Sequence, residues 1–428
     1  MKSSKSKERI AVIGLGYVGL PLMSELSKKF DTIGFDISDS RVSSLKQGYD
    51  TTGELSKSKL SKLSPRLTCN EGDIADRNVY IISVPTPITK NKMPDLRPIT
   101  QACKLVGNLL EKGDLIIFES TVYPGLTEEH CVPLLEKASN LAFIDDFSVG
   151  YSPERINPGD KIHTLTSIVK IVSGSDKKAL SRVNNIYSQI IKAGTYQASS
   201  IKVAEAAKVI ENTQRDINIA LINELSQIFN LLEIDTNEVL NAAKTKWNFN
   251  DFRPGLVGGH CIGVDPYYLT FKAAEMGFHP QMILSGRETN EFMPHYIVNQ
   301  SIAVFKKRKL KPKNLSVIVM GLTFKENCPD IRNSKSLDVL EILSKHFKVV
   351  DAFDPLVDLS SMNIKLHKKV KVLKKVPRSK KYNLVILISP HDSLKKLGVK
   401  YFENLQLNKG IFYDVKSTFG NSTKSLSL

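Results

Sequence analysis

The sequence predicts an α/β protein in which two doubly wound domains, each with a parallel sheet, are joined by a central helical domain. Short apolar strands alternate with helical segments at the start of the chain and again after residue 315, a pattern typical of parallel sheets covered on both faces. Between them, residues 200–232 carry apolar side chains at helical spacing without glycine or proline, which predicts one long spine helix. We place the domains at 1–200, 201–305 and 306–428.

Each sheet domain contains several short apolar segments that we expect to be buried strands. They lie at 9–13, 32–36, 79–84 and 115–119 in the first domain, and at 316–321, 349–355, 384–388 and 410–414 in the last. Helices are expected at 18–29 and 334–346, and further helical segments reach residue 305, interrupted by a glycine-rich loop that holds a cysteine. Ligands of such folds bind at the carboxyl ends of the strands, so functional residues are expected there.

The composition is that of a globular protein with 428 residues, 41% of them hydrophobic and 24% charged. No apolar run approaches the length of roughly 18 residues that a membrane span needs, and the polar N-terminal segment does not resemble a signal peptide. Five cysteines, an odd number without C-x-x-C pairs or zinc spacing, argue against a disulfide framework or a metal site. We therefore expect a cytoplasmic protein without a metal and without membrane attachment.

The chain is basic, with 60 Lys+Arg against 44 Asp+Glu and a net charge of +16. Much of the excess lies at 306–309 and 365–381. Such runs are usually solvated faces, although binding of anionic small molecules would also fit. No DNA- or RNA-binding motif accompanies the charge, so a nucleic-acid partner is not expected.

A glycine motif follows the first strand and opens the first helix. Gly14 permits the tight turn, Gly16 lets the backbone approach a pyrophosphate, and Gly19 allows close helix–sheet packing. Asp36, at the end of the second strand, can accept hydrogen bonds from ribose hydroxyls and would repel a 2′-phosphate, which favours NAD over NADP. The expected cofactor-binding residues here are Gly14, Gly16, Tyr17, Val18, Gly19, Asp36 and Arg41, the last of which could equally be a solvated arginine.

The segment 258–265, GGHCIGVD, is the most informative of the polar segments. Cys261 lies among glycines, with Asp265 four residues later. A thiolate presented in this way can attack a carbonyl carbon. A buried, unreactive cysteine in a glycine turn is the alternative, and this segment alone does not decide between them.

Three other segments are ambiguous when taken singly. Lys208, Asn212 and Arg215 share one face of the long helix, where they could hold an anionic substrate or form an ordinary polar stripe. The segments ESTVYPG at 119–125 and SPERINPG at 152–159 could be site loops or plain connections.

Taken together, these segments resemble the nucleotide-sugar 6-dehydrogenase family, the UDP-glucose and GDP-mannose dehydrogenase group. The resemblance covers nearly the whole chain through GLGYVGLPL at 14–22, SVPTP at 83–87, ESTVYPG at 119–125, SPERINPG at 152–159, KVIEN at 208–212, GGHCIGVD at 258–265 and GLTFKENCPDIRNS at 321–334. It implies an N-terminal NAD-binding Rossmann domain, a C-terminal Rossmann-like domain for the UDP-sugar, and a homodimer formed through the central helix.

The resemblance also implies a four-electron oxidation of the sugar 6-hydroxyl, in which Cys261 forms a thiohemiacetal and then a thioester. Lys208 and Asn212 would stabilise oxyanions, and Asp265 with Lys208 would assist proton transfer. Thr121 and Glu154 would position the hydrolytic water. Further implied cofactor contacts are Pro85, Thr86, Thr121 and Arg332, and further substrate contacts are Glu154, Arg155, Ile156, Lys208, Asn212, Arg215, Arg253, Gly258 and Lys325.

Two departures from UDP-glucose enzymes bear on the substrate. Val264 stands where those enzymes carry a lysine, and the PERINPG segment replaces a more hydrophobic one. Both features, together with His260, resemble the branch that oxidises UDP-N-acetylhexosamines, either the gluco or the galacto epimer, for surface polysaccharides. The alternatives are a UDP-glucose 6-dehydrogenase and a catalytically silent nucleotide-sugar-binding protein.

Overall fold

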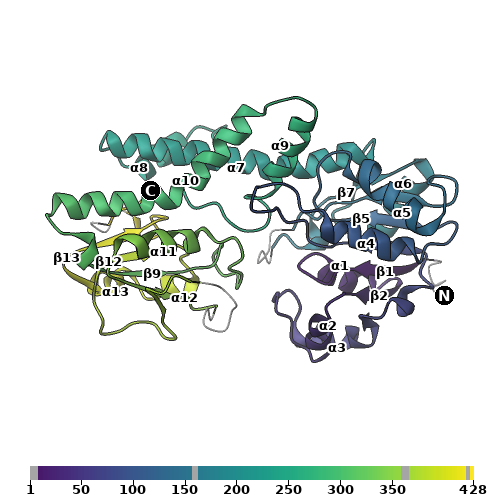
Figure 1. The fold of residues 1–428 in the computed structure, drawn as a ribbon, viewed down its shortest axis with the longest axis horizontal. Helices are drawn as coiled ribbons and strands as arrows, with labels where there is room; N and C mark the ends of the chain where they lie inside the picture. The colour runs from purple at the N-terminus through teal and green to yellow at the C-terminus, as the bar shows by residue number, and fades with distance from the viewer. Residues whose placement is uncertain (1–7, 157–161, 358–365, 421–424) are drawn as a thin grey trace. The chain divides into compact units, whose positions relative to one another are not determined.

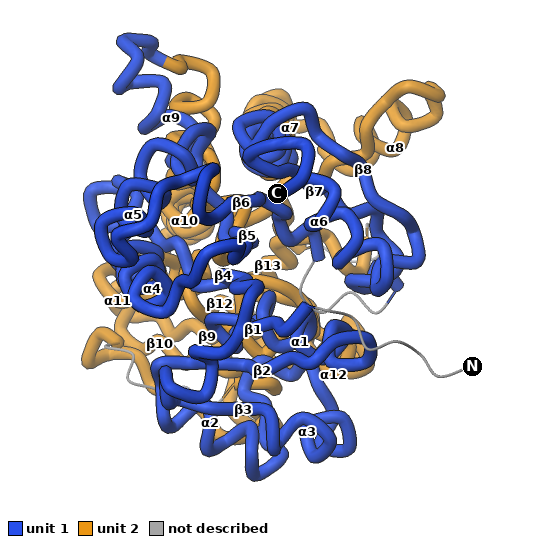
Figure 2. The backbone as a smooth tube through the Cα atoms, turned by 90° about the vertical axis from the view of Figure 1, so that its right-hand side faces the viewer, with its two compact units in different colours: residues 1–211, 267–279 blue, residues 212–266, 280–428 orange. Residues whose placement is uncertain are grey.

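The computed structural model describes residues 8–156, 162–357, 366–420 and 425–428. The chain forms two compact units, each assembled from two stretches of sequence (Figure 2). Unit 1 comprises residues 1–211 and 267–279, and unit 2 comprises residues 212–266 and 280–428. The three domains expected from the sequence are a different division of the chain and stay a prediction.

Unit 1 is built on a sheet with strand order β3-β2-β1-β4-β5-β6-β7-β8 in the described residues. Figure 1 labels four of these strands, β1, β2, β5 and β7. Its strands are β1 (Arg9–Ile13), β2 (Asp31–Phe35), β3 (Leu67–Thr68), β4 (Val79–Ile82), β5 (Leu115–Phe118), β6 (Ser148–Tyr151), β7 (Lys170–Gly174) and β8 (Thr195–Gln197). Its helices include α1 (Gly19–Leu26), α2 (Asp39–Lys46), α3 (Lys57–Leu63), α4 (Arg97–Gly107), α5 (Val132–Ser139) and α6 (Lys177–Ser188). Strands β1, β4 and β5 are apolar and almost wholly buried, as the central strands of a two-sided sheet must be.

One strand pair departs from the expected parallel arrangement. Strand β7 runs antiparallel to β6, while the other pairs in this sheet are parallel. Parallel neighbours need a crossover connection, usually a helix, whereas antiparallel neighbours can be joined by a loop. In the described part of the segment between β6 and β7, the element present is the short 3₁₀ helix Leu165–Ser167 rather than an α-helix, as an antiparallel neighbour allows.

Unit 2 contains a fully parallel sheet with strand order β11-β10-β9-β12-β13 in the described residues. Its strands are β9 (Ser316–Met320), β10 (Val349–Phe353), β11 (Val370–Val372), β12 (Tyr382–Leu387) and β13 (Gln406–Asp414), and its helices include α11 (Lys335–His346), α12 (Asp392–Lys395) and α13 (Val399–Asn404). Alternate β9 residues enter two different cores: Val317 packs with α11, and Ile318 packs with α12 and α13. Both faces of this sheet are therefore covered, as the sequence predicted.

The central helices are α7 (Ile201–Leu231), α8 (Thr236–Ala243), α9 (Asp265–Glu275) and α10 (Gln281–Lys307). Helix α7 has 31 residues and matches the spine helix predicted for residues 200–232. The boundary between the two units falls inside it, between Glu211 and Asn212. The predicted α/β fold with two doubly wound sheets and a long helix is confirmed.

The two sheets repeat one local arrangement at the carboxyl ends of their first two strands. In unit 1, the backbone N–H of Leu15 donates to the carboxylate of Asp36 at 2.8 Å. In unit 2, the N–H of Leu322 donates to Asp354 at 2.6 Å, and the imidazole of the buried His391 lies 3.1 Å from the same carboxylate. Unit 2 therefore places an acidic residue at the same point as unit 1, and in both units the protein itself supplies hydrogen-bond partners to the carboxylate.

Among the described residues, none of the helices combines the length and the apolar character that crossing a bilayer requires.

Candidate functional site

The glycine loop between β1 and α1 has the shape that a dinucleotide requires. Gly14 has a φ of +94°, and a Cβ there would meet the carbonyl oxygen of Ser83 at 3.0 Å. A Cβ on Gly19 would lie 1.9 Å from the Gly14 carbonyl oxygen, so this glycine is needed for packing. Nothing lies within 4 Å of a Cβ built on Gly16, which leaves room for a pyrophosphate. These residues fit NAD.

Asp36 and Arg41 are both held beside this loop. The two carboxylate oxygens of Asp36 accept the N–H groups of Leu15 at 2.8 Å and Ser38 at 2.9 Å. The guanidinium of Arg41 donates to the carbonyl of Leu15 at 2.8 Å and pairs with Asp50 at 2.9 Å. Arg41 thus supports the glycine loop from within the protein, and its contact with the nucleotide stays a prediction, as do those of the half-buried Tyr17 and Val18.

The loops after β4 and β5 carry the other predicted cofactor contacts of unit 1. The Ser120 hydroxyl donates to the carbonyl of Val84 at 2.6 Å and so ties the SVPTP and ESTVYPG segments together. Pro85 is exposed, whereas Thr86 and Thr121 are half-buried. All three lie at the carboxyl edge of the sheet, where α/β folds bind ligands.

Glu205, on α7, fixes the second of these loops and was not predicted from the sequence. Its carboxylate accepts the N–H groups of Gly125 at 2.6 Å and Thr127 at 3.0 Å, and the side chain is fully buried. Burial raises the pKa of Glu205 to about 7, although these hydrogen bonds oppose the rise. A single carboxylate from the spine helix therefore holds the loop that follows Thr121.

The SPER part of the SPERINPG segment follows β6. Glu154 accepts the backbone N–H groups of Arg155 and Ile156, both at 2.6 Å, and Arg155 pairs with Glu211 of α7 at 2.7 Å. These three predicted site residues are adjacent and share one carboxylate-centred turn. Residues 157–159 of the segment lie outside the described residues.

In unit 2, Cys261 lies in a turn that leads directly into α9. Its carbonyl oxygen accepts the N–H groups of Val264 at 3.0 Å and Asp265 at 2.8 Å, and its side chain is a half-buried thiol outside any disulfide. The side-chain amide of Asn212, on α7, donates to the Asp265 carboxylate at 2.5 Å. The structure thus brings together three of the predicted catalytic residues, Cys261, Asp265 and Asn212.

The cysteine loop is packed against the loop 321–334, which follows β9. The N–H of Gly259 donates to the carbonyl of Asn333 at 3.2 Å, and the ring of His260 lies 3.1 Å from the Asp330 carboxylate. Burial would raise the pKa of Asp330, but hydrogen bonds from His260 and Arg332 outweigh it and lower that pKa well below the usual range. His260 therefore contacts an acid whose pKa is lowered.

The remaining predicted contacts differ in their surroundings. Arg332 is largely exposed and pairs with Asp330 at 2.8 Å, and Lys325 is half-buried on the same loop. Arg253 pairs with Asp251 at 2.6 Å. A Cβ on Gly258 would lie 2.6 Å from the carbonyl oxygen of Asn333. On α7, Lys208 is buried and Arg215 is exposed.

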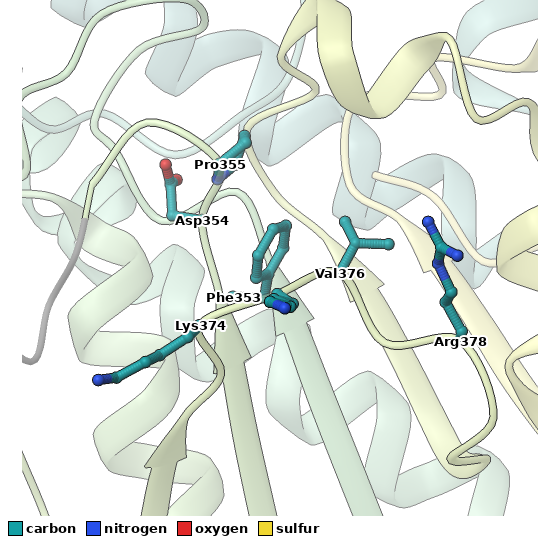
Figure 3. A pocket seen from close by; sticks show the side chains of 7 residues that line it. Phe353, Asp354, Pro355, Lys374, Val376 and Arg378 are labelled. Atoms are coloured by element: carbon teal, nitrogen blue, oxygen red, sulfur yellow. The ribbon is translucent and has the colours of Figure 1, made fainter.

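A separate cavity of about 720 Å³ opens at the carboxyl end of β10 (Figure 3). It is lined by Phe353, Asp354, Pro355, Lys374, Lys375, Val376 and Arg378. None of the predicted site residues lines it, and its lysines belong to the late basic stretch. Within the ranges that the structure describes, no group of three His, Cys, Asp or Glu side chains could hold a metal ion.

Comparison with known proteins places the chain among the dehydrogenases. The profiles that match are those of the NAD binding domain at residues 8–191, the central domain at 202–292 and the UDP binding domain at 318–421, all of one family. The chain belongs to the UDP-glucose/GDP-mannose dehydrogenase family. It is thus an NAD-dependent oxidoreductase of nucleotide sugars, and the prediction of NAD as the cofactor is confirmed.

Similar proteins match along the full length. The UDP-N-acetyl-D-glucosamine 6-dehydrogenase of Pseudomonas aeruginosa is 50% identical over 98% of this chain and 99% of its own. Its namesake from Salmonella typhi is 49% identical over 95% and 96%. Among solved structures, the UDP-D-ManNAc dehydrogenase of Pyrococcus horikoshii superposes with a TM-score of 0.87 at 28% identity and covers 98% of both chains.

Proposed function

We propose that the protein oxidises the 6-hydroxyl of a UDP-N-acetylhexosamine, UDP-GlcNAc or UDP-GalNAc, to the uronic acid. Two findings support this substrate class: the names of the relatives that are 50% and 49% identical over nearly the whole chain, and the PERINPG and GGHC features of the sequence. The observation that carries the reaction type is the Cys261 turn, tied through Asp265 to Asn212 of the spine helix.

Two oxidations and one hydrolysis make up the proposed reaction. NAD⁺ supplies the hydride acceptor for each oxidation. The alcohol loses a hydride and a proton to give the aldehyde, and the Cys261 thiolate adds to the carbonyl carbon while the carbonyl oxygen takes up a proton. The resulting thiohemiacetal loses a second hydride and a proton to give a thioester, and water displaces the thiolate. Overall, the alcohol, two NAD⁺ and one water give the carboxylate, two NADH and three protons.

Each proposed role uses a property of the side chain. A cysteine thiol has a pKa of roughly 8.5, so Cys261 needs nearby positive charge or hydrogen-bond donors to react as a thiolate. Lys208 provides the charge, and the Asn212 amide provides a donor for the developing oxyanion. Asp265 accepts the Asn212 amide at 2.5 Å and assists proton transfer together with Lys208. This pairing holds the amide in place before the substrate binds.

We assign the hydrolytic water to Thr121 and Glu154, and the substrate to the polar residues around the two loops. Glu154 is anchored through two backbone N–H groups at 2.6 Å, which fixes the direction of its carboxylate. The proposed substrate contacts are Glu154, Arg155, Ile156, Lys208, Asn212, Arg215, Arg253, Gly258 and Lys325, and Arg332 is assigned to the cofactor.

We also propose that the protein is a cytoplasmic homodimer whose product is a donor for a surface polysaccharide. Apolar side chains on α7 support the dimer, because Ile210 and Leu221 are each 54% exposed and Ile228 is 43% exposed. Spacings of 11 and 7 residues put these three on one helical face. An apolar face of this kind is typical of an interaction surface.

A panel of sugar nucleotides tests the proposal. Purified protein is incubated with UDP-GlcNAc, UDP-GalNAc, UDP-ManNAc or UDP-Glc while NADH formation is followed. We expect two NADH per sugar with an N-acetylhexosamine. Turnover of UDP-Glc alone would refute the acetylated substrate. If no sugar nucleotide gives NADH, the result would favour the alternative of a catalytically silent nucleotide-sugar-binding protein. Tight, salt-sensitive binding of nucleic acid without any turnover would instead favour a nucleic-acid-binding function for the basic residues.

Replacement of the thiol tests covalent catalysis. In Cys261→Ser, the hydroxyl is a poorer nucleophile and a poorer leaving group than the thiolate. We expect NAD binding to be retained and uronate formation to fall by about a thousandfold or more, as when an enzyme loses its nucleophile. Normal uronate production by this variant would contradict the thioester.

A further inference from the structure

A buried ammonium group lies between two carboxylates at the carboxyl edge of the unit 1 sheet. The Nζ of Lys170, the first residue of β7, lies 2.6 Å from Oε2 of Glu119 and 2.9 Å from the carbonyl oxygen of Pro153. It also lies 3.8 Å from Oε2 of Glu154. The Lys170 side chain is 3% exposed and that of Glu119 is 0% exposed. Lys170 thus touches the segment that carries a proposed hydrolytic residue.

Buried charges are costly unless they are paired and hydrogen-bonded. Glu119 is satisfied on both oxygens, since Lys170 contacts one and the Tyr187 hydroxyl donates to the other at 2.5 Å. Burial nevertheless raises the pKa of Glu119 to about 7; Lys170 opposes this rise and the nearby charge of Glu154 adds to it. Glu119 therefore shares the charge of Lys170 with the nearby Glu154 carboxylate.

One of the two carboxylate oxygens of Glu154 accepts hydrogen bonds from the described residues, and the other does not. Its Oε1 accepts two backbone N–H groups, whereas its Oε2 is buried and has no hydrogen-bond partner among the described residues. An ionised oxygen in that state requires a donor, such as a water molecule, and a nearby positive charge. Lys170, at 3.8 Å, supplies the charge without occupying the oxygen. Oε2 thus remains available to accept a proton.

We infer that Lys170, held in place by Glu119, is a positioning residue that supplies the positive charge beside the Glu154 carboxylate and orients it for hydrolysis of the thioester. The inference rests on the proposed function, because it deepens the role assigned to Glu154. Neither Lys170 nor Glu119 touches the reacting atoms in this scheme; both act through Glu154.

Other charged groups near Glu154 are acids or are already paired. The pKa of Glu54 is raised by burial and by the charges of Asp50 and Glu154, which shows that Glu54 and Glu154 repel each other. The guanidinium of Arg155 is bound to Glu211 at 2.7 Å. Burial, the charge of Glu119 and, to a smaller extent, that of Glu154 raise the pKa of the Tyr187 hydroxyl, which keeps it neutral. Lys170 thus places a positive charge beside both Glu119 and Glu154.

The test is the pH dependence of thioester hydrolysis in two variants of the full-length protein. Glu119→Gln leaves Lys170 with one carboxylate partner, so we expect the acid limb of the profile to move down by about one pH unit. Glu119→Gln/Lys170→Met removes both charges while the Tyr187 hydroxyl can still donate to Gln, so we expect the limb to move above its wild-type position. On that limb, hydrolysis at a fixed pH should then fall by about tenfold for each pH unit that the limb moves up.

Hydrolysis is read separately from oxidation. Intact-protein mass spectrometry measures the thioester on Cys261, and NADH absorbance measures the two oxidations. The double variant should show a normal NADH burst and an accumulated thioester. Asp114→Asn is the matched control, because Asp114 lies just before β5 at the opposite end of the strand from Glu119, and burial raises its pKa to about 6. This control should leave the acid limb where it is.

Glu154→Gln separates the two ways in which the idea can fail. Wild-type hydrolysis in Glu154→Gln would overturn the role of Glu154 itself. Slow hydrolysis in Glu154→Gln, together with unmoved acid limbs in both the Glu119 variant and the double variant, would overturn the role of Lys170 and leave the proposed function intact. A lower thermal midpoint without a moved limb would likewise assign the Lys170 pair to stability alone.

Discussion

Gly259 is closely packed in the cysteine loop, and replacing this glycine by alanine should open the loop. Gly259 has a φ of +83°, and an added Cβ would lie 2.6 Å from the Phe324 ring. The left-handed conformation costs an L-residue roughly 1–2 kcal/mol, and overpacking against a fixed ring costs about 1–3 kcal/mol. Together, Gly259→Ala should destabilise the closed loop by about 2–5 kcal/mol.

The neighbouring Gly263 provides a matched control. It lies in the same loop, its φ is not in the left-handed region, and a Cβ there would meet nothing closer than 3.8 Å. Gly263→Ala should therefore change the loop by less than about 1 kcal/mol. The two variants add the same methyl group four residues apart, so a difference between them reports the conformation and the contact of Gly259.

Hydrogen exchange read by mass spectrometry is the suitable assay, because local opening does not require global unfolding. The reporting amides are those of Gly259, Val264 and Asp265, which donate within the loop or to Asn333. A change of about 2 kcal/mol corresponds to roughly 30-fold faster exchange. We expect at least this acceleration in Gly259→Ala, together with a lower rate of NADH formation. Equal exchange in the two alanine variants would refute the reasoning.

Three further predictions concern stability and assembly. Asp216→Ala should lower stability by about 3–5 kcal/mol in thermal or denaturant unfolding, because it strips the buried Arg287 of a carboxylate at 2.6 Å. Asp216→Asn, which keeps the shape, should cost less. The pKa of Glu205 is raised by burial to about 7 from 4.5, so the folded state holds the extra proton and stability should fall as pH rises from about 5 to 7. Glu205→Gln should flatten that part of the thermal-midpoint profile, and an unchanged slope would argue against the shift. Leu221→Glu on the exposed α7 face should convert the proposed dimer to monomer in light scattering, while Glu224→Gln, on the same helix, should leave the dimer intact.

Local features of the site could be predicted from the sequence. The first strand, the glycine turn and Asp36 lie within about 30 residues of one another. They could be predicted because the glycines meet the steric needs of the turn and because strands alternate with helices in this part of the chain. The long helix could also be predicted, because its apolar side chains recur at helical spacing without a glycine or proline between them. Family resemblance then named Asn212 and Asp265, which the structure joins directly.

Features that depend on distant parts of the chain could not be predicted in the same way. Lys170 and Glu119 are 51 residues apart, and their pairing follows from the position of β7 next to β6. The antiparallel direction of β7 was itself unexpected, because the alternation of strands and helices predicted parallel neighbours. The available signal for such a buried pair was a charged residue at the start or end of an apolar strand, because charged residues are rarely buried unless they are paired. Glu119 was visible as part of a motif, but nothing local to it indicated its partner.

The spine helix also has a consequence for the spacing of two proposed catalytic residues. Lys208 is on the unit 1 side of the boundary inside α7, and Asn212 is the first residue on the unit 2 side. Four residues of helix correspond to an axial rise of about 6 Å. The axial spacing between the backbone positions of Lys208 and Asn212, the proposed cation and the proposed amide donor, is therefore fixed by helix α7 itself.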